Sequence, residues 1–287
     1  MASPPPRTAA PIGPLTPHLY MPTAARPLRA KQQHLRADTR VEPHAHPWGQ
    51  VVLSATGVVR VTAALGTYIV PPSRAVWIPP GVEHAVTVIE DADLLTLYLH
   101  ERRRRTGPAA TPAESAPWRQ CRVLEVGPLM IALALEMDTR PDQVRQAPDA
   151  SALAREKRLA ALLVDELRRA APVRLGVDLP QEKRLRRLCE SVIDNPSRHQ
   201  TLAGWAGDAG ASARTMTRLF RSELATTFLQ WRQQVLLAHA VPLAAQKRSM
   251  SQIAATLGYA SPSAFTAMCR RSVGAPPSRF LRQPPRV

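Results

Sequence analysis

The sequence predicts an α+β protein in which a small antiparallel β-barrel precedes an all-α domain with two helix-turn-helix units. Three observations support this fold class. Short β-branched runs broken by Gly and Pro fill residues 28–99, helical patterning begins near residue 127, and residues 201–231 resemble residues 249–280 as an internal repeat. The 287 residues fit two domains, at roughly 150 residues per domain.

The charge of the chain is concentrated near its C-terminus. The net charge is +16, and residues 181–287 hold 16 basic and 5 acidic side chains, against 22 and 17 in the rest. A basic excess on one domain indicates a polyanionic partner. No run approaches the ~18 apolar residues that cross a bilayer, and the first residues lack the apolar core of a secretion signal. We therefore expect a cytoplasmic protein that makes no membrane contact.

Cysteine usage excludes two further classes. Cys121, Cys189 and Cys269 are widely spaced and contain no Cys-x-x-Cys pair, so they fit neither a disulfide framework nor a zinc finger. We expect Cys189 and Cys269 to be small buried apolar residues.

The N-terminal half is predicted to contain an arm and a β domain. Eight of the first 27 residues are proline, which disfavours helices and inner strands, so residues 1–27 are expected to form a flexible or polyproline-like arm. Residues 28–100 follow as the β domain, because turn signals separate its apolar runs every 8–12 residues.

Residues 101–180 are predicted to form a linker loop and connecting helices. Gly127–Met137 and Ala152–Ala170 carry apolar residues at i, i+3, i+4 spacing. The apolar stripe of the second helix either forms a dimer contact or lies on the chain's own barrel, and the sequence leaves both open. The four arginines Arg102–Arg105 are a solvated loop or an accessory polyanion contact.

The internal repeat, 201–231 and 249–280, lies within a predicted third segment, 181–287, and each copy has the pattern helix, glycine turn, helix. Gly210 and Gly258 supply the left-handed conformation that ends the first helix of each unit. Ser212 and Ser261 can cap the N-terminus of each second helix. A three- or four-residue glycine turn between two helices is typical of a helix-turn-helix.

Residues 182–283 resemble the DNA-binding domain of the AraC/XylS family of bacterial transcription regulators. The stretches ARTMTRLFRSEL, FLQWR and IAATLGYASPSAFTAMCRRSVGAPPSRF carry the resemblance. It implies two helix-turn-helix units joined by a long helix, here about 227–245, that enter successive major grooves of double-stranded DNA about 34 Å apart.

The resemblance also indicates the DNA-contacting residues. In helix 213–223, Arg214, Thr217 and Arg218 match the positions that read bases in the family. The two arginines either bind guanine edges or merely touch phosphates. The other residues expected at the DNA are Arg221, Lys247, Arg248, Ser261, Ser263, Thr266, Arg270 and Arg271.

Three positions depart from the family pattern. Pro242 falls inside the predicted linking helix, where it removes a hydrogen bond and is expected to bend the helix. Ala225 stands where the family usually has Gly, and Cys269 where it usually has Phe.

The N-terminal β domain is similar to a cupin, the barrel that several such regulators use as a sensor. His44-x-His46-x3-Gln50-x6-Gly57 matches the first cupin motif and Pro79-x-Gly81-x2-His84 the second. His44, His46, Gln50 and His84 then form one of three things. They hold a divalent transition metal such as Zn, Ni, Cu or Fe(II), they line an apolar effector pocket with Trp77, or they remain as a relic motif that packs the barrel.

These observations predict a sequence-specific DNA-binding transcription regulator with an N-terminal cupin-like β-barrel that responds to a small-molecule or metal effector. We expect a homodimer, with RNA polymerase as a further partner, and no enzymatic activity. A cupin metal oxygenase or isomerase is one rival, weakened by Gln50 where metal-binding cupins usually carry Glu. An architectural DNA binder without sequence preference is the other.

Overall fold

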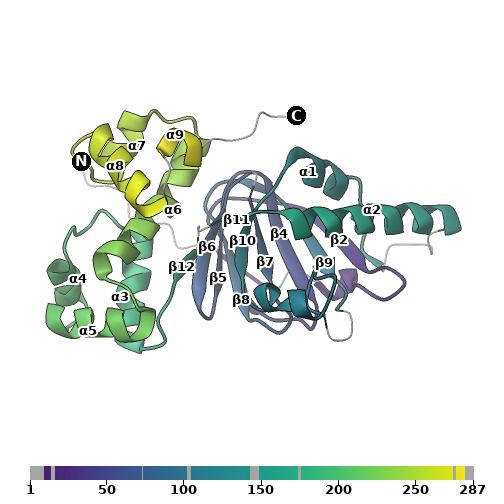
Figure 1. The fold of residues 1–287 in the computed structure, drawn as a ribbon, viewed down its shortest axis with the longest axis horizontal. Coiled ribbons are helices and arrows are strands. Elements are labelled where there is room, and N and C mark those ends of the chain that lie inside the picture. The colour runs from purple at the N-terminus through teal and green to yellow at the C-terminus, as the bar shows by residue number, and fades with distance from the viewer. Residues whose placement is uncertain are drawn as a thin grey trace. The chain divides into compact units, whose positions relative to one another are not determined.

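The computed structural model describes residues 10–13, 17–72, 74–101, 105–142, 149–173, 176–273 and 276–281. Their internal contacts divide them into two compact units (Figure 1). The first is formed by the described residues up to 63 and from 70 to 173, and the second by those from 64 to 69 and from 176 to 281. No described helix is both long enough and apolar enough to cross a membrane.

The first unit contains two β-sheets, which confirms the predicted fold class. In one sheet β1, β3, β8 and β5 lie side by side, and the other has the order β11-β10-β7-β4-β9-β2. Neighbouring strands pair antiparallel except β1 and β3, which are parallel. The strands are β1 Ala10–Ile12, β2 Leu28–Leu35, β3 Thr39–His44, β4 Gly49–Thr56, β5 Val59–Ala63, β7 Arg74–Ile78, β8 His84–Val88, β9 Ala92–Leu99, β10 Arg122–Glu125 and β11 Pro172–Val173.

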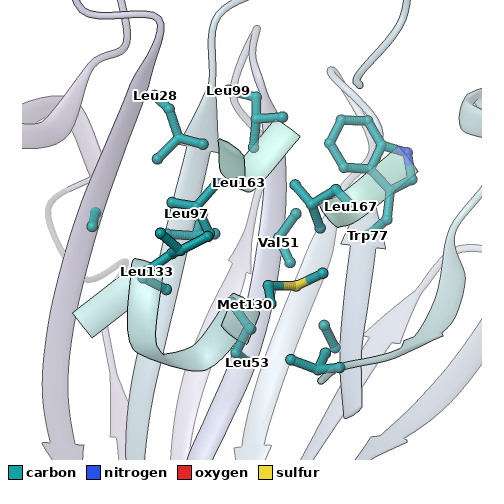
Figure 2. Packing of buried hydrophobic residues seen from close by; sticks show 14 of the residues in the cluster. Leu28, Val51, Leu53, Trp77, Leu97, Leu99, Met130, Leu133, Leu163 and Leu167 are labelled. Carbon is teal, nitrogen blue, oxygen red and sulfur yellow. The ribbon is translucent and has the colours of Figure 1, made fainter. Parts of the chain in front are cut away.

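One face of the second sheet is covered by helices α1 (Pro128–Leu135) and α2 (Ala150–Arg169). Because side chains alternate along a strand, Val51 and Leu53 of β4 point to this face and Gln50 to the other. Figure 2 shows Met130 of α1 and Leu163 of α2 packed over the apolar side chains of the strands. This cluster is the main core of the unit, and it leaves the opposite face of the sheet for polar side chains.

Helix α2 therefore lies on the barrel of its own chain. Ala160, Leu163 and Leu167 form its apolar stripe and are buried in the cluster beneath it. Leu162, on the outer side of the helix, stays 53% exposed. Of the two interpretations that the sequence left open, the intramolecular packing is confirmed, and the buried stripe is not a free dimer surface.

The expectation of a flexible arm over residues 1–27 is wrong for the part that the structure describes. Ala10–Ile12 forms β1, and Pro17–Tyr20 forms a 3₁₀ helix, η1. Tyr20 is buried against Trp48 and Tyr98, and Arg26 makes an ion pair of 2.9 Å with Glu156 of α2. Proline disfavours inner strands, but β1 is an edge strand, where it is tolerated. Residues 1–9 and 14–16 lie outside the described residues.

The boundary predicted at residue 100 is also wrong, because much of 101–173 belongs to the first unit. β10 pairs with β7 and β11, so the presumed linker extends the second sheet. A 3₁₀ helix, η2 (Ala113–Arg119), places Trp118 against Trp77. Of the arginine run, Arg102–Arg104 lie outside the described residues, and Arg105 donates to the Ala110 carbonyl.

The second unit is helical, apart from β6 (Gly66–Val70) paired with β12 (Gly176–Asp178). Trp231 anchors it, with its indole nitrogen donating to the Asp178 carbonyl at 2.7 Å. Cys189 and Cys269 are fully buried, as predicted. The helices are α3 Lys183–Asp194, α4 Leu202–Asp208, α5 Ala213–Leu224, α6 Phe228–Ala245, α7 Met250–Thr256, α8 Pro262–Val273 and α9 Pro277–Phe280.

Candidate nucleic-acid interface and sensor site

Helices α4 and α5 form the first helix-turn-helix. Gly210 between them has φ of 63°, a left-handed conformation that suits glycine. The Ser212 hydroxyl then accepts from the Thr215 amide at 3.1 Å and caps α5. Met216 and Phe220 are buried beneath the helix, which leaves its other face to solvent.

The exposed face of α5 is strongly basic. Arg214, Thr217, Arg218 and Arg221 are all exposed, at the i, i+3, i+4, i+7 spacing of one helical face. They line one shallow depression. The Thr217 hydroxyl donates to the Ala213 carbonyl at 2.8 Å, which fixes its side chain along the helix. The structure thus brings the four predicted residues of this unit together on a free surface.

The end of α5 carries a departure from the family pattern. Ala225 adopts φ of 49°, the left-handed conformation, where the family usually has glycine. Its amide donates to the Phe220 carbonyl and ends the helix. An L-residue there costs roughly 1 kcal/mol relative to glycine.

Helices α7 and α8 repeat the arrangement. Ser249 and Gln252 form a reciprocal capping box, and Gly258 has φ of 79°. The Ser261 hydroxyl accepts from the Ala264 amide at 3.2 Å. Ser263 is exposed and Thr266 half-buried, so the outer face of α8 carries small polar side chains, unlike that of α5.

The predicted phosphate-contacting residues of this unit are exposed. Arg270 and Arg271 lie on the last turn of α8. Lys247 has φ of 60° just after α6, and the Arg248 amide donates to the Leu243 carbonyl at 3.2 Å. These bonds close the end of α6 and hold both basic residues directly before α7.

Helix α6 joins the two helix-turn-helix units and contains Pro242, as predicted. Pro242 lies in the last turn, so the missing amide interrupts only the end of the helix. The helix begins with a capping box between Thr227 and Gln230. The linking helix is therefore continuous from Phe228 to Ala245.

In the first unit, three histidines converge at the ends of β3 and β8. His44 pairs directly with His84 across these strands, with ring centroids 4.4 Å apart, and the His46 ring lies 5.3 Å from that of His84. One ring nitrogen from each lies within 4.8 Å of the others. His46 and His84 are buried and His44 is half-buried.

The backbone orients all three rings. The Nδ1 atoms of His44, His46 and His84 lie 2.8–2.9 Å from the carbonyls of Glu42, Trp48 and Val82. A neutral imidazole that donates from Nδ1 keeps a lone pair on Nε2, the arrangement found in metal-binding histidines. Nε2 of His84 is buried and has no hydrogen-bond partner among the described residues.

Gln50 lies beside this cluster. Its side-chain oxygen is placed 2.5 Å from Nε2 of His46. In this arrangement the Gln50 oxygen accepts from the Nε2–H of His46, and turning the amide end for end would instead let its NH₂ group donate to a neutral ring. Burial lowers the pKa of His84 to about 4 and lowers that of His46, so both rings are neutral at pH 7.

Trp77 is not part of this site, which corrects the predicted effector pocket. Val51 pairs with Trp77 across β4 and β7, and both point to the helix-covered face. Trp77 is fully buried there and its indole nitrogen donates to the Trp118 carbonyl at 2.8 Å. The tryptophan beside the histidines is Trp48, whose ring stacks on His46 at 5.0 Å.

A small cavity of about 30 Å³ is lined by His44 of the cluster. Pockets for drug-sized ligands are roughly ten times larger or more. Its lining includes Lys31, His44, Gln50 and Tyr98. The sequence prediction missed Lys31, which is 3% exposed and whose pKa is lowered to about 8 by burial. Its alternation with the helix-facing Leu28 and Ala30 is the only signal for its inward direction.

Comparisons with known proteins match both units. A model described as AraC-like ligand binding domain matches residues 30–163, and one described as helix-turn-helix domain matches residues 205–283. The transcriptional regulator NimR of Escherichia coli is 30% identical over 249 residues, which cover 86% of this chain and 85% of NimR. The regulator RipA of Corynebacterium glutamicum is 33% identical over 102 residues, 36% of this chain and 31% of RipA. A solved structure of ToxT from Vibrio cholerae has 10% identity and a TM-score of 0.35, with 89% of this chain and 97% of ToxT covered.

Proposed function

Because the chain belongs to the AraC family of helix-turn-helix transcription regulators, we propose that α5 and α8 read two successive major grooves of a promoter. The observation that carries this proposal is the basic face of α5. Arg214, Thr217 and Arg218 project from one side of a helix whose opposite side is buried. An α-helix of this kind fits the major groove of B-DNA.

The first unit of the repeat supplies most of the sequence preference. Arg214 and Arg218 are exposed and free to bind the O6 and N7 atoms of guanine, a contact worth about 1–3 kcal/mol of discrimination. Arg221, one turn further along, lies toward the end of the helix and contacts phosphate. The absence of acidic residues in the first turn of α5 leaves the positive end of its dipole uncompensated for DNA.

The second helix-turn-helix, α7 and α8, mainly positions the protein on the DNA. Ser261, Ser263 and Thr266 are short and support only limited base reading. Lys247 and Arg248 before α7, and Arg270 and Arg271 at the end of α8, neutralise phosphates. This division predicts a DNA site in which the half under α5 has a defined base sequence, whereas the half under α8 accepts several bases at each position.

Footprinting and binding titrations on DNA upstream of the protein's own gene test the function. A protected segment, bound tighter than random DNA of equal length at the same salt concentration, supports sequence-specific regulation. Equal affinity for both DNAs refutes it and favours an architectural DNA binder.

We further propose that the regulator acts as a homodimer and contacts RNA polymerase. Because the stripe of α2 is buried in its own unit, the dimer must use other surfaces, such as the exposed Leu162, Leu129 and Leu135. Light scattering of the full-length protein gives the mass directly, and a monomer at all concentrations refutes the dimer.

We propose that the effector site is the histidine cluster and that it holds a divalent transition metal. The residues fit such an ion, because each of the three histidines brings one ring nitrogen within 4.8 Å of the others, on rings held by backbone carbonyls. The orphaned Nε2 of His84 favours this interpretation over a packing relic, since a buried nitrogen without a partner is costly. The small cavity disfavours a bulky apolar effector.

Metal titration of chelator-treated full-length protein tests the sensor site. We expect one equivalent of Zn, Ni, Cu or Fe(II) to bind, and His84→Ala to remove it. His34→Ala is the matched control, because His34 lies on the exposed side of β2 next to Asp93. Equal metal uptake by both variants refutes the site. Promoter binding in the same samples shows whether the metal shifts the population able to bind DNA.

A further inference from the structure

Lys31 on β2 is a buried charged residue of the first unit. The side chain is 3% exposed, and its Nζ has no hydrogen-bond partner among the residues that the structure describes. The Nζ atom lies 5.3 Å from the centroid of the Tyr20 ring. Arg29, two residues earlier on the same face of the strand, instead pairs with Asp142 at 2.6 Å. Among the described residues, Lys31 is thus a buried cation of this strand without a counter-charge.

Lys31 borders the cavity of about 30 Å³ next to the histidine cluster. That space holds about two water molecules. The polar groups that share its wall are Gln33, His44, Gln50, Thr96 and Tyr98, and none of the described lining residues is Asp or Glu. The cavity therefore combines a positive charge with uncharged hydrogen-bonding groups and lacks a negative charge.

A buried ammonium group without a partner is unfavourable, because it has lost its hydration shell and gained no opposite charge. Burial lowers the pKa of Lys31 to about 8, which still leaves the group mainly protonated at pH 7. A small anion would restore the missing interaction. The limited space favours the smallest oxyanions, such as formate, and disfavours larger molecules.

We propose that this cavity binds a small planar oxyanion, in the first instance a carboxylate, with Lys31 as its counter-charge and Thr96, Gln33 and Gln50 as neutral partners. The proposal rests on the effector-responsive function proposed above and names a chemical class of effector for it. His44 lines the cavity and also belongs to the histidine cluster, and Gln50 lines the cavity and contacts His46, so an anion here would lie beside the proposed metal position and offset the charge of both cations.

Calorimetric titration of chelator-treated full-length protein with sodium formate, acetate and nitrate, against sodium chloride at equal ionic strength, tests the site. We expect saturable binding of formate and acetate to one site per chain. Lys31→Met should lower the affinity at least about tenfold, or 1.4 kcal/mol. Lys157→Met is the matched control, because Lys157 is exposed on α2. Binding of nitrate as well would extend the class from carboxylates to planar oxyanions in general.

Two outcomes overturn the proposal: the absence of saturable binding by the unaltered protein, or equal affinities of the Lys31→Met and Lys157→Met variants. Thr96→Val, which keeps the side-chain shape and removes the hydroxyl, gives a second measure that does not alter the charge, and we expect it to weaken binding. Promoter binding is measured on the same preparations. Normal DNA binding without anion uptake overturns only the oxyanion site, whereas anion uptake without sequence-specific DNA binding supports the site and overturns the regulator function.

Discussion

Replacing Leu163 by Ala is expected to destabilise the first unit by about 3 kcal/mol. Leu163 is fully buried between α2 and the sheet, in the cluster that contains Val51 and Leu97. Truncation removes the transfer free energy of its methyl groups and leaves a cavity, and Leu→Ala changes at such sites cost roughly 2–5 kcal/mol. Both residues favour helix, so the change reports packing rather than helix propensity.

The neighbouring Leu162 provides the matched control. It lies on the same helix and is 53% exposed, so Leu162→Ala should change the free energy of unfolding by about 0.5 kcal/mol or less. Urea unfolding of full-length variants, followed by tryptophan fluorescence, measures both, because Trp77 and Trp118 belong to the same cluster as Leu163.

The measurement is repeated over a range of protein concentrations. A loss that is larger for Leu162→Ala than for Leu163→Ala, or one that changes with protein concentration, would refute the reasoning. Either result would mean that the apolar stripe of α2 is stabilised by a second copy rather than by its own sheet.

Three further predictions concern DNA reading, helix termination and pH. Arg218→Ala should weaken binding to the cognate site by about 1–3 kcal/mol and remove the base preference at one position in a selection from randomised sites. Replacing the exposed Arg169 by Ala should leave DNA binding unchanged. An equal loss of affinity for all sequences would show that Arg218 contacts only phosphate. Ala225→Gly should stabilise the second unit by about 0.5 kcal/mol in thermal unfolding, because relief of the left-handed strain exceeds the added freedom of the unfolded chain; a lower Tm contradicts this. The folded-state pKa of Lys31, about 8, lies below its ordinary value of 10.5, so between these pH values the unfolded state binds more protons than the folded state. The free energy of unfolding of the protein, measured relative to that of Lys31→Met, should therefore rise with pH in this range, by at most about 3 kcal/mol. A difference that stays constant with pH contradicts the lowered pKa.

The helical unit was predictable in detail from its sequence because its signals are local. Gly210 and Gly258 do adopt left-handed conformations, and Ser212 and Ser261 do cap the helices that follow. Capping and turn conformations depend on residues within one or two helical turns, so they can be predicted without knowledge of the rest of the fold.

The first unit was harder to predict because its decisive contacts are distant in sequence. An amphipathic stripe shows that α2 buries one side but not against what, and the sheet beneath it includes strands more than a hundred residues earlier. The same limit explains Trp77: strand alternation assigns it to a face of β7, but only the position of α1 and α2 shows which face the helices cover.

Within one site, the histidine cluster was predicted from the sequence, whereas Lys31 was not. His44, His46 and His84 come from recognisable motifs, and the structure does bring them together. Lys31 was missed because a lysine on an edge strand is normally expected to reach solvent, whereas here η1 folds over it and Tyr20 covers its end. The segment that buries Lys31 is the proline-rich one expected to be flexible.

The position of β1 has a consequence for how the protein can be handled. Ala10–Ile12 occupies the outer margin of its sheet, beyond β3, and Pro11 in its middle has no backbone N–H to offer a further strand. Open margins of this kind recruit strands from neighbouring molecules, and a short strand that contains proline discourages them. Trimming the chain to begin at residue 28 would remove β1, uncover β3 and favour aggregation, so shortened versions should retain residues 10–27.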